Sequence, residues 1–202
     1  AWLLMLPAAL IMAFVAVVPL ATVLNYSFHD IFRLDRVFWV GTDWYENILI
    51  SIDFWKSLAR SIVFSSLALG IQFPLGIGIA LLLRRARPYL ATLVLMCLAI
   101  PLVVPTNMIA GLWLAFLRAD GLGGQAMTAL NFTLDYKFTA GHTWTLVLIV
   151  DTWHWLGLVV IMAYAGLSSI SPAYYQAAAI DSASRLDVFR WIELPQISGA
   201  LW

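Results

Sequence analysis

Residues 144–167 read WTLVLIVDTWHWLGLVVIMAYAGL, an apolar run that contains one carboxylate, Asp151, and no lysine or arginine. A helix of about 20 such residues crosses a hydrocarbon layer of about 30 Å. Similar runs extend over residues 2–25, 58–83 and 89–117. Backbone polar groups in lipid need partners within the chain, so runs of this length form helices rather than barrel strands. The sequence therefore predicts an all-α membrane protein, a multi-span helical bundle.

The composition of the 202-residue chain supports this prediction. Apolar residues make up 63% of the chain, charged residues 11%, and the formal net charge is zero. Soluble domains contain only about 45–50% apolar residues, so a soluble enzyme is excluded, and the balanced charge argues against a nucleic-acid partner. The single cysteine and the scattered histidines lack metal-ligand spacing, and neither lysine follows a glycine-rich phosphate loop. We therefore expect no metal, cofactor or catalytic site in this chain.

The arginines at 84, 85 and 87 predict the orientation of the chain. They lie in a short turn between two spans, and such basic turns stay in the cytoplasm. Both termini of the chain are then cytoplasmic. The segments 28–55 and 118–143 are expected outside, as lids or docking loops.

Local sequence features predict how the spans bend and pack. Pro101 and Pro105 lie inside the third run, and because proline lacks an amide hydrogen, that helix should bend or break there. Small residues four positions apart let another helix approach closely. In the second run they occur at Ser61 and Ser65 and at Gly76 and Ala80.

Polar and aromatic side chains within the spans are candidates for a solute pathway. Asp151, His154 and Trp155 share one face of the predicted helix. A carboxylate at the bilayer centre costs about 2.5–3.5 kcal/mol, so this face must meet a pathway or the interior of the bundle. In the third run, Asn107 and Trp113 could contact a polyhydroxylated solute. Alternatively, Asn107 could hydrogen-bond to backbone groups freed by the prolines, and Trp113 could serve only in packing. Both interpretations remain open for all five residues.

The segment 168–195 is more polar and carries helix boundaries. Ser171 before Pro172 predicts a helix start, and a helix through residue 180 should end at a bend. Ser184 and Asp187 fit a capping box that opens a second helix, which Pro195 should stop.

The motif in this segment resembles a known one. Residues 175–184, YQAAAIDSAS, followed by Phe189, Ile192 and the pair Leu194–Pro195, resemble the EAA loop of permease subunits of binding-protein-dependent ABC importers. The Ile-Asp-x-Ala variant is similar to the carbohydrate branch. Leu6–Pro7, Pro19 and residues 25–28 resemble the first permease of maltose and glycerol-3-phosphate systems.

The resemblance implies a transport subunit rather than an enzyme. It implies a bacterial or archaeal cytoplasmic (inner) membrane protein in the lipid bilayer, a second related permease, an external solute-binding protein, and a cytoplasmic ATPase dimer that binds ATP and magnesium. The solute would be a sugar, a polyol or a glycerol derivative. Residues 1–202 would form a single permease domain, incomplete at its C-terminus because the family continues through two more spans. The implied ATPase-coupling residues are Tyr174, Tyr175, Gln176, Ala177, Ala178, Asp181, Ser182 and Ala183.

Two positions depart from the family pattern, and one rival function remains. Gln176 stands in place of the usual glutamate, and Ser182 in place of the usual glycine, which favours a less strained bend unless Ser182 adopts a positive φ. The rival is an ion- or proton-coupled secondary transporter that uses Asp151 and His154 as a relay.

Overall fold

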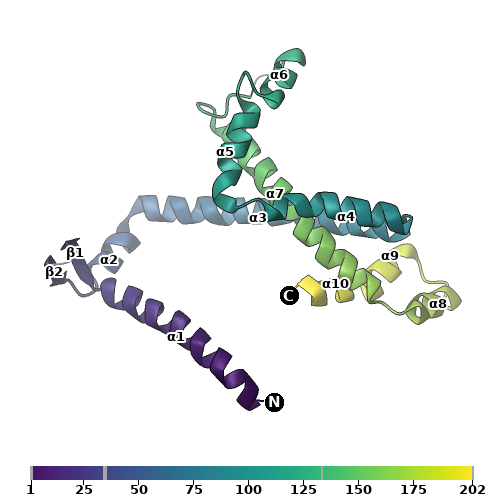
Figure 1. The fold of residues 1–202 in the computed structure, drawn as a ribbon, viewed down its shortest axis with the longest axis horizontal. Coiled ribbons are helices and arrows are strands. Elements are labelled where there is room, and N and C mark those ends of the chain that lie inside the picture. The colour runs from purple at the N-terminus through teal and green to yellow at the C-terminus, as the bar shows by residue number, and fades with distance from the viewer. Residues whose placement is uncertain (1, 34–35, 133, 202) are drawn as a thin grey trace. The chain divides into compact units, whose positions relative to one another are not determined.

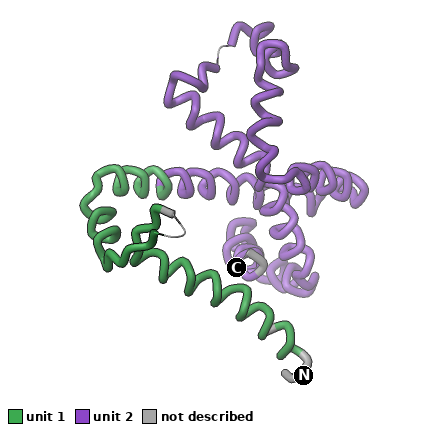
Figure 2. The backbone as a smooth tube through the Cα atoms, turned by 60° about the vertical axis from the view of Figure 1, so that its left-hand side comes forward, with its two compact units in different colours: residues 1–62 green, residues 63–202 purple. Residues whose placement is uncertain are grey.

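The computed structural model describes residues 2–33, 36–132 and 134–201, which form a predominantly helical chain (Figure 1). Contacts within the chain divide it into two units, residues 1–62 and 63–202 (Figure 2). We describe each unit by itself.

The first unit contains a long apolar helix followed by a hairpin. Its elements are α1 (Trp2–Tyr26), β1 (His29–Arg33), β2 (Arg36–Trp39), α2 (Asp43–Ile50) and the beginning of α3 (Ile52–Arg85). The two strands are antiparallel, with His29 opposite Trp39. Phe28 stacks on Trp39 with ring centroids 5.4 Å apart. The segment predicted as an outer loop, 28–55, is therefore folded into a hairpin and a helix, and its last residues already belong to α3.

The second unit is a helical bundle that holds the candidate functional residues. After the remainder of α3 come α4 (Pro88–Val103), α5 (Thr106–Leu117), α6 (Leu122–Ala129), α7 (Ala140–Ser168), α8 (Pro172–Ile180), α9 (Arg185–Val188), the π-helical turn η1 (Phe189–Glu193) and α10 (Leu194–Leu201). Helix α7 runs through the middle of the unit, where it packs against α4 and α10 (Figure 1). The segment predicted as the second outer loop, 118–143, contains α6 and the first turn of α7.

The apolar helices confirm the predicted fold class. Within the described chain, α3 and α7 are long and apolar enough to cross a membrane, as is α1 from Met5 to Tyr26. These helices correspond to three of the four predicted runs and extend beyond several of their predicted ends.

The third predicted run is not one continuous helix. It forms α4 and α5, which are bent by 103° at a short break. Val104 is extended there, with φ −71° and ψ 122°, and its N–H donates to the carbonyl of Pro101. Residues that precede a proline disfavour the helical region, and Pro105 follows directly. The predicted bend is confirmed, and α4 and α5 together are long and apolar enough to count as one broken span.

Small residues allow the helices of the second unit to pack closely. Ala80 of α3, Ala163 and Leu167 of α7, and Ile197 of α10 form one buried cluster. At the α3–α7 crossing, a Cβ atom added to Gly76 would lie 2.9 Å from the Cβ atom of Val159. The predicted packing role of the small pair in α3 at 76 and 80 is thus confirmed. The serine pair at 61 and 65 is exposed instead.

Helix α4 crosses α7 even more closely. A Cβ atom added to Gly157 would overlap the carbonyl oxygen of Leu98 and lie 2.8 Å from its carbonyl carbon. Leu83, Ala91 and Val160 form a second buried cluster that joins α3, α4 and α7. The middle of α7, which carries the candidate polar residues, is therefore held by backbone-level contact with α4.

Candidate functional site

Asp151 is held by an amide from another helix. Gln72 Nε2 of α3 donates to Asp151 Oδ2 of α7 over 2.7 Å. The Gln72 side chain lies in the interior, at 5% exposure. The sequence analysis did not single out Gln72, although an amide within an apolar run was a signal for it. One carboxylate oxygen of Asp151 is thus engaged within the bundle, which supports the interpretation that Asp151 pairs there.

Asp151 also borders two cavities, one on each side of α7. The first, between α5 and α7, has a volume of about 450 Å³ and is lined by Trp113 and His154 among other residues. The second, between α3 and α7, also has about 450 Å³ and is lined by Gln72. Asp151 and Trp155 line both cavities. The two readings of Asp151 are therefore compatible, because it pairs with Gln72 and still borders open space.

Two residues that line the first cavity each carry a buried nitrogen atom without a hydrogen-bond partner in the described part of the chain. His154 is 4% exposed. In the described part of the chain, His154 Nδ1 and Trp113 Nε1 make no hydrogen bond. A buried polar group left unsatisfied costs about 1–3 kcal/mol, so these two nitrogens are hydrogen-bonding groups that the described residues leave unsatisfied. Asn107, the remaining pathway candidate, is exposed at the start of α5 and lines neither cavity.

The helix α8 forms with the caps expected from its sequence. The Ser171 hydroxyl accepts the N–H of Ala173 over 3.4 Å, and Pro172 occupies the first turn. The second helix begins at the predicted capping box, in which Ser184 and Asp187 each satisfy the other's backbone N–H. These boundaries are confirmed because each depends on residues within one turn of the helix end.

The bend after α8 is a Schellman motif with a strained residue. Ser182 N–H donates to the carbonyl of Ala179 over 3.2 Å, and Ala183 N–H donates to the carbonyl of Ala178 over 2.9 Å. Ser182 adopts φ +52°, a region that disfavours residues with a Cβ atom. The bend is therefore the strained one, with serine at a position that glycine would occupy without cost.

Replacing Ser182 with glycine should therefore stabilise the bend, by about 1 kcal/mol. We expect slower amide hydrogen exchange in α8 and a higher melting temperature of the assembled complex. Ser182→Ala is the matched control, because it also removes the hydroxyl but keeps the Cβ atom. Equal behaviour of the glycine and alanine variants would contradict the strain at this position.

The implied coupling residues lie on two different faces of α8. Ala178 is the one residue buried in the helix, and Tyr175, three positions earlier, is half-buried on the same side. Tyr174, Ala177 and Asp181 follow the i, i+3, i+7 spacing of a second face, about 100° round the helix, and are exposed. Gln176, Ser182 and Ala183 are exposed as well.

Pro195 does not stop the second helix, contrary to the sequence-based expectation. After α9 the chain passes through η1 and continues as α10, which begins at Leu194. The N–H of Leu194 donates to the carbonyl of Phe189, five residues earlier. Such a π turn widens the helix, and Pro195 falls in the first turn of α10, where its missing N–H is tolerated.

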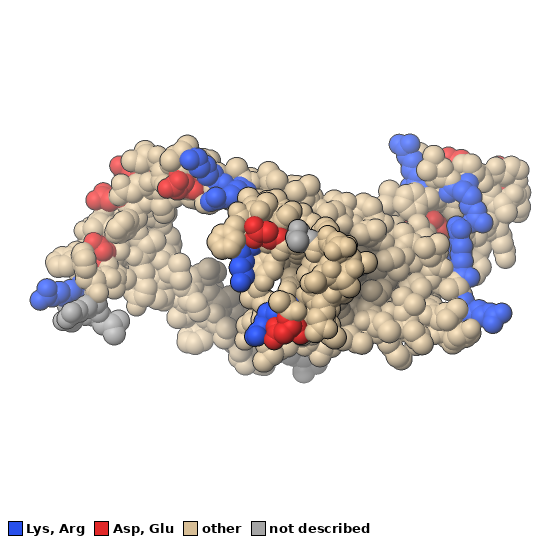
Figure 3. Space-filling view, turned by 90° about the horizontal axis from the view of Figure 1, so that it is seen from above, with Lys and Arg blue, Asp and Glu red and all other residues tan. Residues whose placement is uncertain are grey.

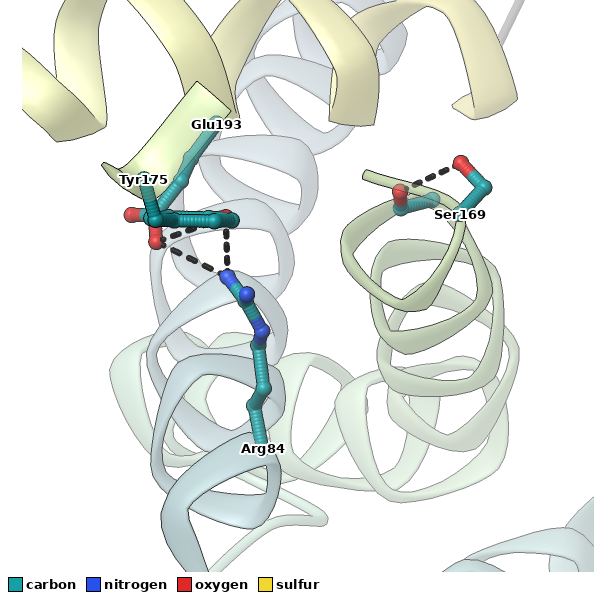
Figure 4. A network of polar contacts seen from close by, with 5 residues as sticks. Arg84, Ser169, Tyr175 and Glu193 are labelled. Carbon is teal, nitrogen blue, oxygen red and sulfur yellow. Dashed lines mark hydrogen bonds and ion pairs between the residues drawn. The ribbon is translucent and has the colours of Figure 1, made fainter. Parts of the chain in front are cut away.

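Arg84 connects the end of α3 to the EAA-like segment (Figure 4). Its Nη1 atom donates to the Tyr175 hydroxyl of α8 and to Glu193 Oε1 of η1 over 3.1 Å. The guanidinium carbon lies 4.2 Å from the centroid of the Tyr175 ring. The two segments predicted to be cytoplasmic, the basic turn and the EAA-like segment, are thus in direct contact.

The surroundings of this network are basic. Figure 3 shows Lys and Arg side chains gathered over the part of the second unit that holds α8 and α9. A cavity of about 230 Å³ is lined by Arg84, Arg85, Arg185, Tyr175 and Glu193, together with Leu81. Partial burial raises the pKa of Tyr175 above its ordinary value of 10.0, although the nearby guanidinium of Arg84 opposes that rise. The hydroxyl therefore keeps its proton at neutral pH.

Comparisons with known proteins place these features in a family. A probable ABC transporter permease protein of Pyrococcus horikoshii is 30% identical over 95% of this chain and 69% of its own length. The trehalose/maltose transport system permease protein MalF of Thermococcus litoralis is 27% identical over 99% of this chain and 68% of its own. The crystal structure of a bacterial ABC transporter that imports the acidic polysaccharide alginate contains a chain of the same fold. It matches with a TM-score of 0.77 and 23% identity, over 97% of this chain and 68% of that chain.

The family match covers both the Asp151 region of α7 and the EAA-like segment. The model of the binding-protein-dependent transport system inner membrane component matches residues 72–201. This range begins at Gln72, the partner of Asp151, and includes α7, α8 and the segment that bears Glu193. The chain is an integral membrane protein and belongs to the family of binding-protein-dependent transport system inner membrane components.

Proposed function

We propose that this chain is the membrane-spanning subunit of an ATP-driven importer of a carbohydrate, in the class of sugars, polyols and glycerol derivatives. It would form the pathway together with a second related permease in the cytoplasmic (inner) membrane of a bacterium or archaeon. The observation that carries the proposal is α8, a short helix that is capped at its start and at its end. Tyr174, Ala177 and Asp181 form an exposed face of this helix, here called its outer face. The trehalose/maltose permease among the relatives supports the carbohydrate class.

The outer face of α8 is the proposed contact with a cytoplasmic ATPase dimer. A short capped helix moves as a rigid body, so closure of two ATPase subunits around ATP and magnesium would displace it as a unit. The contact surface would be Tyr174, Ala177 and Asp181. Gln176, which is exposed and uncharged, would add a neutral hydrogen bond where the family pattern has a carboxylate.

The cavities beside α7 are the proposed part of the solute pathway. Trp155 borders both, and flat aromatic faces suit the C–H surfaces of a sugar ring. Asp151 keeps one carboxylate oxygen beyond the one that accepts from Gln72. His154 Nδ1 and Trp113 Nε1 could exchange hydrogen bonds with hydroxyl groups. An external binding protein, which the family description implies, would deliver the solute.

The geometry favours this function over a proton-coupled secondary transporter. A relay needs titratable groups in hydrogen-bond contact with one another. The observed partner of Asp151 is the amide of Gln72, which cannot accept and pass on a proton at neutral pH. The Nδ1 atom of His154 has no hydrogen-bond partner in the described residues.

Uptake by the complex reconstituted in proteoliposomes separates the two functions. We expect an ATPase subunit that binds but cannot hydrolyse ATP to abolish uptake, while a protonophore leaves it unchanged. Asp151→Asn should retain ATP-driven uptake and raise the apparent KM by about tenfold, the effect of one lost charge-assisted hydrogen bond. Uptake that survives loss of ATP hydrolysis, but is lost with the protonophore and in Asp151→Asn, would establish the secondary transporter instead.

A further inference from the structure

We propose that Arg84, Tyr175 and Glu193 form a clamp that transmits displacement of the coupling helix α8 to the membrane-spanning helix α3. The inference rests on the proposed function and adds the contacts through which movement of α8 reaches α3 within this chain. It assigns positioning roles to Glu193, which the sequence analysis did not single out, and to Arg84, which the sequence analysis used only to predict orientation. It also gives Tyr175 a role directed toward this chain rather than toward the ATPase.

The clamp is a closed set of contacts among three elements. Arg84 comes from the last turn of α3, Tyr175 from α8, and Glu193 from the end of η1. Arg84 donates to both partners, and the Tyr175 hydroxyl donates to Glu193 Oε1 over 3.3 Å. Because each residue contacts the other two, α8 and η1 are tied to each other across the intervening bend, and both are tied to α3 (Figure 4).

The clamp is needed because α8 has little apolar attachment of its own. Ala178 is its one buried residue, and an alanine side chain contributes little burial. Helix α10, by contrast, is held by the fully buried Ile197 and packs along α7. A force applied to α8 could therefore bend the loops beside it rather than move a span. Contacts at Tyr175 give the helix a direct connection to the bundle.

The environment strengthens these contacts beyond those of a surface ion pair. The side chain of Glu193 is 12% exposed and that of Arg84 is 29% exposed. Exposed ion pairs contribute little to stability because water and salt screen them, whereas hydrogen bonds to charged groups contribute more than neutral ones when the groups are partly buried. The guanidinium also lies over the Tyr175 ring, which an ammonium group could not match in the same planar, multi-donor geometry.

The test measures solute molecules imported per ATP hydrolysed. The full-length permease is reconstituted with its partner permease, ATPase dimer and binding protein, and both rates are expressed per assembled complex. We expect Arg84→Gln to keep ATPase activity and to lower the ratio by at least about tenfold, because the charged donor to both Tyr175 and Glu193 is lost. Arg85→Gln is the matched control, because it removes the neighbouring charge, which makes no hydrogen bond or ion pair in the described chain.

Two further variants separate transmission from folding. Tyr175→Phe keeps the ring and removes only the hydroxyl, so it should assemble normally and lower the ratio by a smaller factor. The charge exchange Arg84→Glu with Glu193→Arg should recover part of the ratio that each single change loses. Loss of assembly alone would not produce such recovery, because both rates are counted per complex.

Three results would overturn the clamp. They are a wild-type ratio in both Arg84→Gln and Tyr175→Phe, an equal loss in Arg85→Gln, and no recovery in the charge exchange. If Arg84→Gln does not assemble, the ratio of solute imported to ATP hydrolysed in Tyr175→Phe tests the clamp, and a wild-type ratio there overturns it. Failure of the proposed function looks different, because the unmodified complex would then show no ATP-dependent uptake.

Discussion

Gly157→Ala should prevent most of the permease from accumulating as a folded, assembled subunit. The added Cβ atom would overlap the backbone carbonyl of Leu98, and a backbone atom cannot rotate away as a side chain can. Helices α4 and α7 would have to separate, which would open the buried cluster around Val160. Overpacking of this kind costs about 1–3 kcal/mol, and contact with backbone places this site at the upper end.

The measurement is the yield of monodisperse complex after mild detergent extraction, together with its melting temperature. Gly141→Ala is the matched control, because Gly141 also lies in α7 but has no atom within 4 Å of an added Cβ atom. In that variant we expect a yield like that of the unmodified chain. A wild-type yield and melting temperature for Gly157→Ala would mean that α4 and α7 do not cross this closely.

Ala177→Glu should uncouple ATP hydrolysis from solute uptake while the subunit still inserts and folds. Ala177 is exposed on the outer face of α8, so a larger charged side chain fits without disturbing this chain. The new side chain would instead project into the proposed contact with the ATPase and weaken binding of α8 there. We expect uptake to fall by at least about tenfold, the factor that corresponds to about 1.4 kcal/mol.

The control is Ala179→Glu, the same substitution on an exposed alanine two residues, or about 200°, further round the helix. It should leave uptake nearly unchanged. Ala178→Glu should lower the amount of folded subunit, because Ala178 is buried within this chain. Crosslinking between a cysteine at 177 and the ATPase follows the contact directly. Normal uptake and crosslinking in Ala177→Glu would remove α8 from the proposed interface.

Local features were predictable because their causes lie within a turn or two of one helix. The apolar runs gave the positions of α1, α3 and α7. Proline at 101 and 105 gave the break between α4 and α5, and the capping residues gave the starts of α8 and α9. The hairpin between α1 and α2 was missed, because its short strands lie in the segment 28–55, which was predicted only as an outer loop.

At two other positions the backbone of a neighbouring turn decided the outcome: the expected stop at Pro195 was wrong, and the alternative left open for Ser182, a positive φ, is the one observed. Pro195 is a helix breaker by its chemistry, yet η1 shifts the hydrogen-bond pattern so that the helix continues through it. Ser182 accepts a positive φ because the two backbone bonds of the Schellman motif over-determine the bend. In each case the backbone arrangement outweighed the preference of a single residue.

The sequence by itself determined which segments are apolar helices, where they bend and where they are capped, because hydropathy and capping act between neighbours in the chain. The tertiary structure alone decided which distant side chains meet. Gln72 reaches Asp151 over 79 positions, and Arg84 reaches Tyr175 and Glu193 over 91 and 109 positions. These pairings depend on where α3 lies against α7 and α8. That placement follows from close packing at glycine and alanine, which a single sequence does not reveal.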